Sequence, residues 1–139
     1  MAYEESLRSI TLEADATLGV YTGVPGTRDN IAGYTPNYVG FQYRFVKVTG
    51  DHTVGLADAD DTNVVGVLQN KPQGPGHAAT VGFHGVSKVQ ADGVVAAGAA
   101  VAASADGQAT ATVGVGGRLG VALSSAAAAG ELIAVLLDK

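Results

Sequence analysis

The sequence contains no cysteine and no long hydrophobic run, and each absence excludes a class of protein. Without cysteine, the fold depends on neither disulfides nor thiolate metal sites. The longest apolar stretch, 94–103, is interrupted by Gly98 and is far shorter than the roughly 18–20 residues of a membrane-spanning helix. Residues 1–10 include Glu4 and Glu5 and lack an apolar run, so we expect no signal peptide and a soluble product made in the cytoplasm.

Basic residues are also few. Eight lysines and arginines stand against 13 aspartates and glutamates, which gives a net charge of −5 and an isoelectric point near 4.9. The basic residues are scattered along the chain, whereas nucleic-acid binding depends on clustered lysine and arginine. The charge pattern therefore excludes a nucleic-acid partner.

Aromatic residues are scarce in most of the chain. Seven of the eight lie within the first 45 positions, and only Phe83 follows. The apolar content of 47% consists mainly of alanine and valine, next to 20 glycines. A core of small side chains gains less from burial, at about 0.8 kcal/mol per CH₂ group. We therefore expect oligomerisation to supply further buried area.

A short pattern of glycine and valine occurs twice in the chain, at a spacing of 54 positions. In each copy an apolar strand is followed by a connection of glycine, proline, alanine or serine and then by a second apolar strand. The matching positions are Val65 and Leu119, Gly66 and Gly120, Val67 and Val121, Leu68 and Ala122, Gly76 and Gly130, and Val81 and Val135. Such self-similarity is typical of one structural unit used twice.

Segments of alternating or β-branched apolar residues predict an all-β fold. We expect a small β-barrel or β-sandwich built from hairpins with a pseudo-repeat, plus an extended N-terminal arm. The predicted strands are 8–13, 41–48, 53–57, 64–69, 78–83, 86–90, 110–115, 118–123 and 132–137. Strand 132–137 is apolar at every position, which predicts a central strand covered on both sides or a subunit contact.

The acidic segment after residue 57 resembles a calcium loop, because Asp58, Asp60, Asp61 and Asn63 would supply the oxygen ligands that this ion prefers. The pattern then fails, since Asn63 occupies the position of the sharp-turn glycine and Gln69 that of the bidentate glutamate. The segment therefore indicates a solvated turn.

The glycine-rich segment 114–120 resembles a phosphate-binding loop, but Leu119 stands where the dinucleotide pattern needs glycine. These glycines instead indicate tight turns or bulges. His77 and His84 lack a third metal ligand in a known motif, and His52 with Asp51 does not by itself define a catalytic triad. We expect a protein that is not an enzyme and that has no metal and no cofactor.

The aromatic-rich first part of the chain has two kinds of aromatic residue. Phe41, Tyr43 and Phe45 alternate along a predicted strand, so we expect them in the core. Segment 20–40 has no periodicity, so its tyrosines are hard to bury within one subunit. Tyrosine and arginine are typical interface residues, and we predict a capsid or subunit interface formed by Tyr21, Arg28, Tyr34 and Tyr38.

Segments 43–48, 64–72, 78–81, 85–89, 97–98 and 119–123 together resemble the small capsid cement or decoration proteins of tailed bacteriophages, the DUF2190-like family. The resemblance covers residues from 41 to the C-terminus. It implies a virion structural protein, made in the host cytoplasm, that binds the outer surface of the assembled head. It also implies a homotrimer that cements neighbouring copies of the major capsid protein, with 1–40 as an extended arm and loop and 41–139 as the β-rich decoration domain.

Two alternatives belong to other classes. The first is a soluble β-domain that binds a glycan or small ligand, as in a tail- or fibre-associated adhesin, with Tyr34, Tyr38 and Asp29 near the ligand. The second is an enzyme that uses the loose histidine and aspartate groups described above. Saturable sugar binding would favour the adhesin, and loss of function at the histidines would favour the enzyme.

Overall fold

A computed structural model describes residues 7–18, 20–21, 38–39, 41–72 and 75–138. In these residues the structure is nearly all β, and the helical element is one 3₁₀ turn, η1 (Ala105–Gly107). No helix in the described part of the chain is both long and apolar enough to cross a membrane. The strands are β1 (Leu7–Ala14), β2 (Val20–Tyr21), β3 (Tyr38–Val39), β4 (Phe45–Gly50), β5 (Thr53–Leu56), β6 (Val64–Leu68), β7 (Ala78–Gln90), β8 (Ala100–Ala103), β9 (Ala109–Thr110), β10 (Gly120–Ala122) and β11 (Leu132–Leu137).

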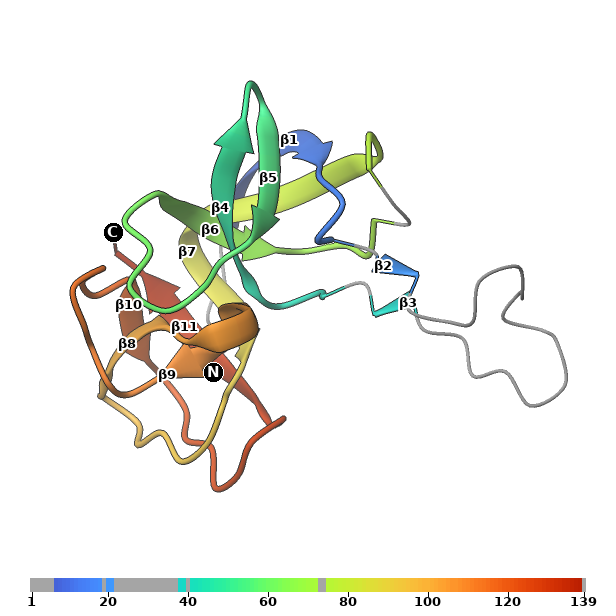
Figure 1. Cartoon of the computed structure of the whole chain (residues 1–139). Coiled ribbons are helices and arrows are strands. Elements are labelled where there is room, and N and C mark those ends of the chain that lie inside the picture. The colour runs from blue at the N-terminus through green and yellow to red at the C-terminus, as the bar shows by residue number, and fades with distance from the viewer. Residues whose placement is uncertain (1–6, 19, 22–37, 40, 73–74, 139) are drawn as a thin grey trace, which may run out of the picture.

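Strands β1, β5, β4, β6 and β7 close into a five-stranded barrel, the first barrel (Figure 1). Strand β1 closes the ring, because it pairs in parallel with β5 and antiparallel with β7. The interior is filled by small and medium apolar side chains: Ala14, Leu18, Val46, Val54, Leu68, Ala79 and Val81. This arrangement confirms the predicted all-β barrel.

Strand β7 belongs to two groups of strands. Its first part pairs with β1, and its last part pairs with β11. The sequence predicted two strands, 78–83 and 86–90, with a break at His84 and Gly85, and this prediction is wrong. Gly85 has a φ of 108°, a conformation that only glycine adopts readily. The strand continues through this point, with an irregularity at Phe83 where the register with β1 shifts between Arg8 and Ser9.

The C-terminal strands form a second ring, the second barrel, made of the last part of β7 with β11, β10, β8 and β9. The ring closes where Ala91 forms a parallel bridge with Ala109. The backbone N–H of Asp92 donates to the carbonyl of Ala109 at 2.9 Å. The first barrel closes in the same way, since the N–H of Asp15 donates to the carbonyl of Val54 at 2.9 Å.

The repeat seen in the sequence therefore corresponds to a structural repeat, in which residues 54 positions apart have equivalent strand-pairing partners. Val67 pairs with Gly82 in the first barrel, and the residues 54 positions later, Val121 and Leu136, pair in the second. Side chain and backbone contacts follow the same rule. The amide of Thr80 donates to the side chain of Asn70 at 2.9 Å, and that of Ala134 donates to Ser124, also at 2.9 Å.

The interiors of the two barrels correspond residue by residue. When the strand registers of the two barrels are aligned, each interior residue of the first barrel has an equivalent in the second. The equivalent positions are Ala14 and Ala91, Leu18 and Val95, Val46 and Val101, Val54 and Ala109, Leu68 and Ala122, Ala79 and Ile133, and Val81 and Val135. At two of these equivalent positions the large and the small side chain are interchanged between the barrels. The first barrel has a large residue at 68 and a small one at 79, whereas the second has Ala122 and Ile133, which keeps the filled volume similar.

The wall between the barrels is buried on both sides. On β4, Val46 points into the first barrel while Phe45 belongs to the second core cluster, and both are 0% exposed. On β6, Leu68 likewise belongs to the core of the first barrel, and Val67 belongs to the same core cluster as Phe45. Strands β4 and β6 are therefore apolar on both faces because each face contacts a different core.

Several strand boundaries differ from the prediction. Strand β4 begins at Phe45 rather than 41, because Tyr43 has a φ of 66° and turns the chain. Phe41 and Tyr43 are consequently half-buried, and only Phe45 lies fully in the core. The predicted strands 110–115 and 118–123 are also wrong in length, since β9 and β10 are short and a glycine loop lies between them.

Strand β11 has the predicted bounds but not the predicted burial. It is central in its sheet, between β7 and β10, and Ile133, Val135 and Leu137 are buried. On the other face Leu132 is 50% exposed and Leu136 is 40% exposed. The expectation that both faces are covered within one chain is therefore wrong, and the alternative of a subunit contact stays a prediction.

The boundary at residue 40 also needs correction. Strand β1 and Leu18, which lie inside the predicted N-terminal arm, are parts of the first barrel and its core. Residues 1–6, 19, 22–37 and 40 lie outside the described residues. Strands β2 and β3, which also fall within the predicted arm, pair with each other in a separate two-stranded sheet.

Candidate functional site

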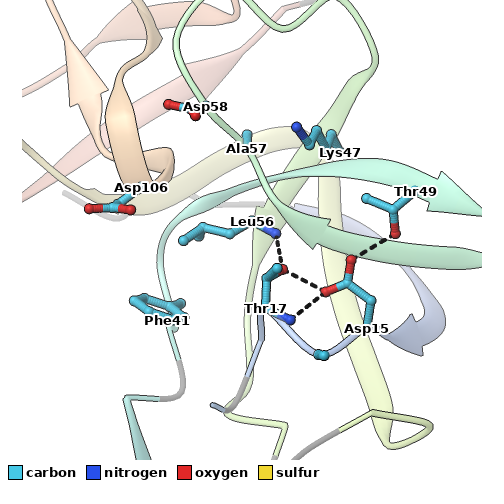
Figure 2. A pocket seen from close by; sticks show the side chains of 10 residues that line it. Asp15, Thr17, Phe41, Lys47, Thr49, Leu56, Ala57, Asp58 and Asp106 are labelled. Carbon is cyan, nitrogen blue, oxygen red and sulfur yellow. Dashed lines mark hydrogen bonds between the residues drawn. The ribbon is translucent and has the colours of Figure 1, made fainter. Parts of the chain in front are cut away.

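A pocket of about 530 Å³ opens at one end of the first barrel. Volumes of 300–1,000 Å³ are typical of sites for small ligands. Figure 2 shows that its walls come from the segment after β1, from β4, from the end of β5 and from η1 of the second barrel. The lining residues are Asp15, Ala16, Thr17, Phe41, Lys47, Thr49, Leu56, Ala57, Asp58 and Asp106.

One end of the pocket is organised by the carboxylate of Asp15. It accepts hydrogen bonds from the backbone N–H and the hydroxyl of Thr17, at 2.8 and 2.5 Å, and from the hydroxyl of Thr49 at 2.8 Å. The Thr17 hydroxyl in turn accepts from the N–H of Leu56 at 2.8 Å. This network, visible in Figure 2, connects the ends of β1, β4 and β5.

Gly55 leaves room for the Asp15 carboxylate. A Cβ atom built on Gly55 would lie 2.1 Å from Oδ2 of Asp15, closer than any real contact. In the second barrel the residues equivalent to Asp15, Thr17 and Gly55 are Asp92, Val94 and Thr110, and Val94 is 74% exposed. The hydrogen-bond network is therefore a feature of the first barrel, and sequence analysis missed it because Asp15 and Gly55 are far apart in the chain.

The other end of the pocket combines an aromatic ring with charged groups. The guanidinium carbon of Arg44 lies 5.3 Å from the centroid of the Phe41 ring, a cation–π arrangement. Arg44 also donates to the backbone carbonyl of Asp106 at 2.9 Å. Burial lowers the pKa of Arg44 below its ordinary value, and the carboxylate of Asp106 opposes this change. Through these two contacts Arg44 connects η1 to the Phe41 ring.

Lys47 lines the upper wall and is already paired. Its ammonium group lies 2.9 Å from Oδ2 of Asp61. Burial alone would raise the pKa of Asp61, but the hydrogen bonds from Lys47 and from the N–H of Asp58, together with the charge of Lys47, lower it below its ordinary value. Lys47 is thus held at the pocket by a carboxylate outside it.

The acidic segment and the glycine-rich segment, which the sequence indicated to be a solvated turn and a set of tight turns or bulges, contact each other. Oδ1 of Asp60 accepts from the backbone N–H of Val115 at 2.8 Å. A Cβ atom on Gly114 would lie 2.1 Å from that oxygen, and one on Gly116 would lie 2.5 Å from the carbonyl oxygen of Asp61. The glycines at these two positions permit close packing, and the contact joins the second barrel to the first.

The remaining side chains of the acidic segment also have protein partners. Oδ1 of Asp58 accepts from the N–H of Ala59, and the amide of Asn63 donates to the carbonyl of Val48 at 2.8 Å. Within the described ranges no group of three or more histidines and carboxylates is placed to hold a metal. His52, His77 and His84 are all exposed and lie on the β4–β5 turn, before β7 and within β7.

The predicted interface residues lie largely outside the described residues. Tyr21 and Tyr38 are register partners in the β2–β3 pair, so their backbones lie side by side. Their side chains, and all of Arg28 and Tyr34, belong to the part that the structure does not describe. The chain leaves toward β2 just after Thr17 and returns at Phe41, and both of these residues line the pocket.

The pocket combines an apolar floor of Leu56 and Ala57, an aromatic wall and oxygen acceptors at both ends. Such a surface fits a polar ligand with an apolar face, or a side chain of a partner protein.

The fold as a whole is that of an all-β protein made of two small barrels that use one strand in common. No protein-family model matches the chain, and no curated protein sequence matches it, so the DUF2190-like family is not supported. Among solved structures, the chain is similar to the N base of the head fibre gp8.5 of bacteriophage phi29. The TM-score is 0.62 at 17% identity, and the match covers 96% of this chain and 95% of that chain. The likeness is one of fold.

Proposed function

We propose that this protein is a structural protein of a phage head, bound to the outer surface of the assembled capsid. In this role it cements neighbouring major capsid subunits as a homotrimer and acts without catalysis. The observation that supports the proposal most directly is the fold, which over nearly the whole chain is like that of a protein from a phage head.

We propose further that the excursion between β2 and β3 is the docking element. It leaves and re-enters the first barrel at the pocket, beside Thr17 and Phe41. Arg28 and Tyr34 within it, and Tyr21 and Tyr38 on the strands that flank it, are of the types that form anchors in protein interfaces. A modest contact of this kind is multiplied when many copies bind one symmetric shell.

The experiment mixes the purified protein with expanded empty heads of the encoding phage and sediments the mixture. The protein should pellet with the heads in a saturable manner. A variant in which a short Gly-Ser turn replaces 22–37 keeps the β2–β3 register and should remain in the supernatant, while Val115→Lys, at an exposed site on the glycine loop, should pellet normally. If the full chain stays in the supernatant, the proposed role is wrong.

The pocket favours one second candidate, the binding of a saccharide or similar small polar ligand. Sugars commonly contact an aromatic ring with one face and carboxylates with their hydroxyl groups, and Phe41, Asp15 and Asp58 provide both. The expected result is saturable binding in a saccharide screen that Phe41→Ala abolishes and that Ile10→Ala, at an exposed position in the middle of β1, does not affect. Absence of binding across the screen would remove this candidate.

A further inference from the structure

Four register partners form a row across the first barrel, and three of them are completely covered. The row runs from Ser9 on β1 through Gly82 and Val67 to Phe45 on β4. Val67 and Phe45 are 0% exposed, although they point away from the barrel interior. They are buried because the second barrel packs on them and forms one core cluster with them.

The second barrel contains the equivalent row. Val86 pairs with Leu136, Leu136 with Val121, and Val121 with Ala100 on β8. Here the row is only partly covered by the described part of the chain: Val86, Ala100 and Val121 are half-buried, and Leu136 is 40% exposed. Next to it, Leu123 and Leu132 are 51% and 50% exposed, so an apolar face continues beyond the row.

This open face also has a hollow that suits an inserted side chain. A cavity of about 380 Å³ lies beside Ala134, between Leu132, Val86 and Ser124. The charged group lining it is Lys88, in a protein whose net charge is −5. A second copy of an acidic protein would therefore meet apolar atoms and one positive charge here, and not a surface of its own sign.

We propose that this face, made of Val86, Ala100, Val121, Leu123, Leu132 and Leu136, is covered by a second copy of the chain. Repeated units bury a continuous core by stacking, and the last unit of a stack exposes the surface that the previous units bury. The contact between the barrels supplies the geometry, because the same row is a buried interface one unit earlier. A barrel of a second copy would therefore cover this face as the second barrel covers the equivalent row of the first.

The two barrels contact each other through different surfaces, so the predicted contact between copies is also heterologous. A heterologous contact forms a closed ring when its rotation permits. The ring size of three rests on the proposed function, whereas the location of the contact does not. An experiment can therefore contradict the ring size without contradicting the location of the contact, and the reverse.

The test measures the mass of the full chain in solution by light scattering over a range of concentrations. The full chain should have about three times the mass of its 13.8 kDa monomer, and Leu136→Lys should weaken the association tenfold or more, because a charge is placed in the contact. Val115→Lys is the matched control, since residue 115 is 85% exposed and lies on the loop whose backbone contacts Asp60. Circular dichroism establishes that both variants are folded.

Each outcome decides between the possibilities. A wild-type chain that is monomeric at high concentration overturns the inference, and the proposed function survives if that monomer still pellets with heads. A Leu136→Lys variant that keeps the wild-type mass also overturns it. If this variant keeps its mass but no longer pellets, the face contacts the capsid instead of a second copy. A monomeric variant that still pellets supports both proposals.

Discussion

Two glycines in equivalent strands lie against the backbone of a neighbouring strand. A Cβ atom on Gly66 would lie 2.1 Å from the carbonyl oxygen of Gly82, and one on Gly120 would lie 2.3 Å from that of Leu136. A backbone carbonyl in a paired strand cannot move aside cheaply. These glycines are therefore required by close approach of the strands and not by an unusual φ.

Gly120→Ala should destabilise the protein by about 1–3 kcal/mol, the usual cost of overpacking. Urea unfolding followed by circular dichroism measures the change in midpoint. Gly93→Ala is the matched control, because a Cβ atom there would meet nothing within 4 Å. Equal midpoints for the two variants would show that the strands separate without cost.

The Lys47–Asp61 pair should make stability depend on pH. The pKa of Asp61 is lowered in the folded state, so its contribution is present above the ordinary value of 3.8 and is lost as the pH falls through the lower folded value. At pH 7, Asp61→Asn should cost about 0.5–1 kcal/mol, and the difference from wild type should shrink as the pH falls below about 4.

A double-mutant cycle with Lys47→Gln is the control for this prediction. If the two residues act as a pair, the double variant should be no less stable than Asp61→Asn alone. Additive losses would contradict the assignment of the effect to this ion pair.

At the scale of the element, interior residues of the first barrel can be replaced by those at the equivalent positions of the second. Leu68→Ala should cost about 2–5 kcal/mol, because it leaves a cavity in the first barrel. Adding Ala79→Ile should restore part of the loss, since the second barrel has alanine and isoleucine at these two positions.

Urea unfolding of the wild type, both single variants and the double variant measures this coupling. Ala79→Ile alone should destabilise, because it overfills the barrel while Leu68 is present. A double variant that is less stable than Leu68→Ala would show that the two interiors are not interchangeable.

The sequence predicted those elements whose pattern is local. The repeat of β6–β7 in β10–β11 was detectable because glycine and valine recur at one spacing, and the β4–β5 hairpin was marked by its turn residues. The correspondence of β1 with the last part of β7 was not predicted. One reason is that these two segments share only small apolar residues at their interior positions. Another is that the residues inserted between β2 and β3 make the offset between these two segments differ from the 54 positions of the rest of the repeat.

The pocket could not be predicted for a related reason. Its residues come from four segments that meet only when the first barrel closes and η1 reaches it. Asp15, Thr17 and Thr49 are ordinary loop residues in the sequence, and their network depends on the space at Gly55. Tertiary closure determines this site, whereas the local pattern does not.

At the scale of the whole molecule, the common strand β7 and the shared wall should make the two barrels unfold together. Ile133→Ala, in the interior of the second barrel, should cost about 2–5 kcal/mol. Hydrogen exchange measured by mass spectrometry should then become faster in β1 and β5 of the first barrel as well as in β10 and β11. Faster exchange confined to β10 and β11 would contradict cooperative unfolding.

Gly85 has one more consequence. It is the register partner of both Leu7 and Leu137, and paired residues in antiparallel strands have Cα atoms about 5.5 Å apart. Leu7 and Leu137 therefore lie within about 11 Å of each other. A peptide attached directly at residue 7 and one attached directly at residue 137 would therefore leave the molecule from neighbouring points, so tags at the two positions would be displayed at one site.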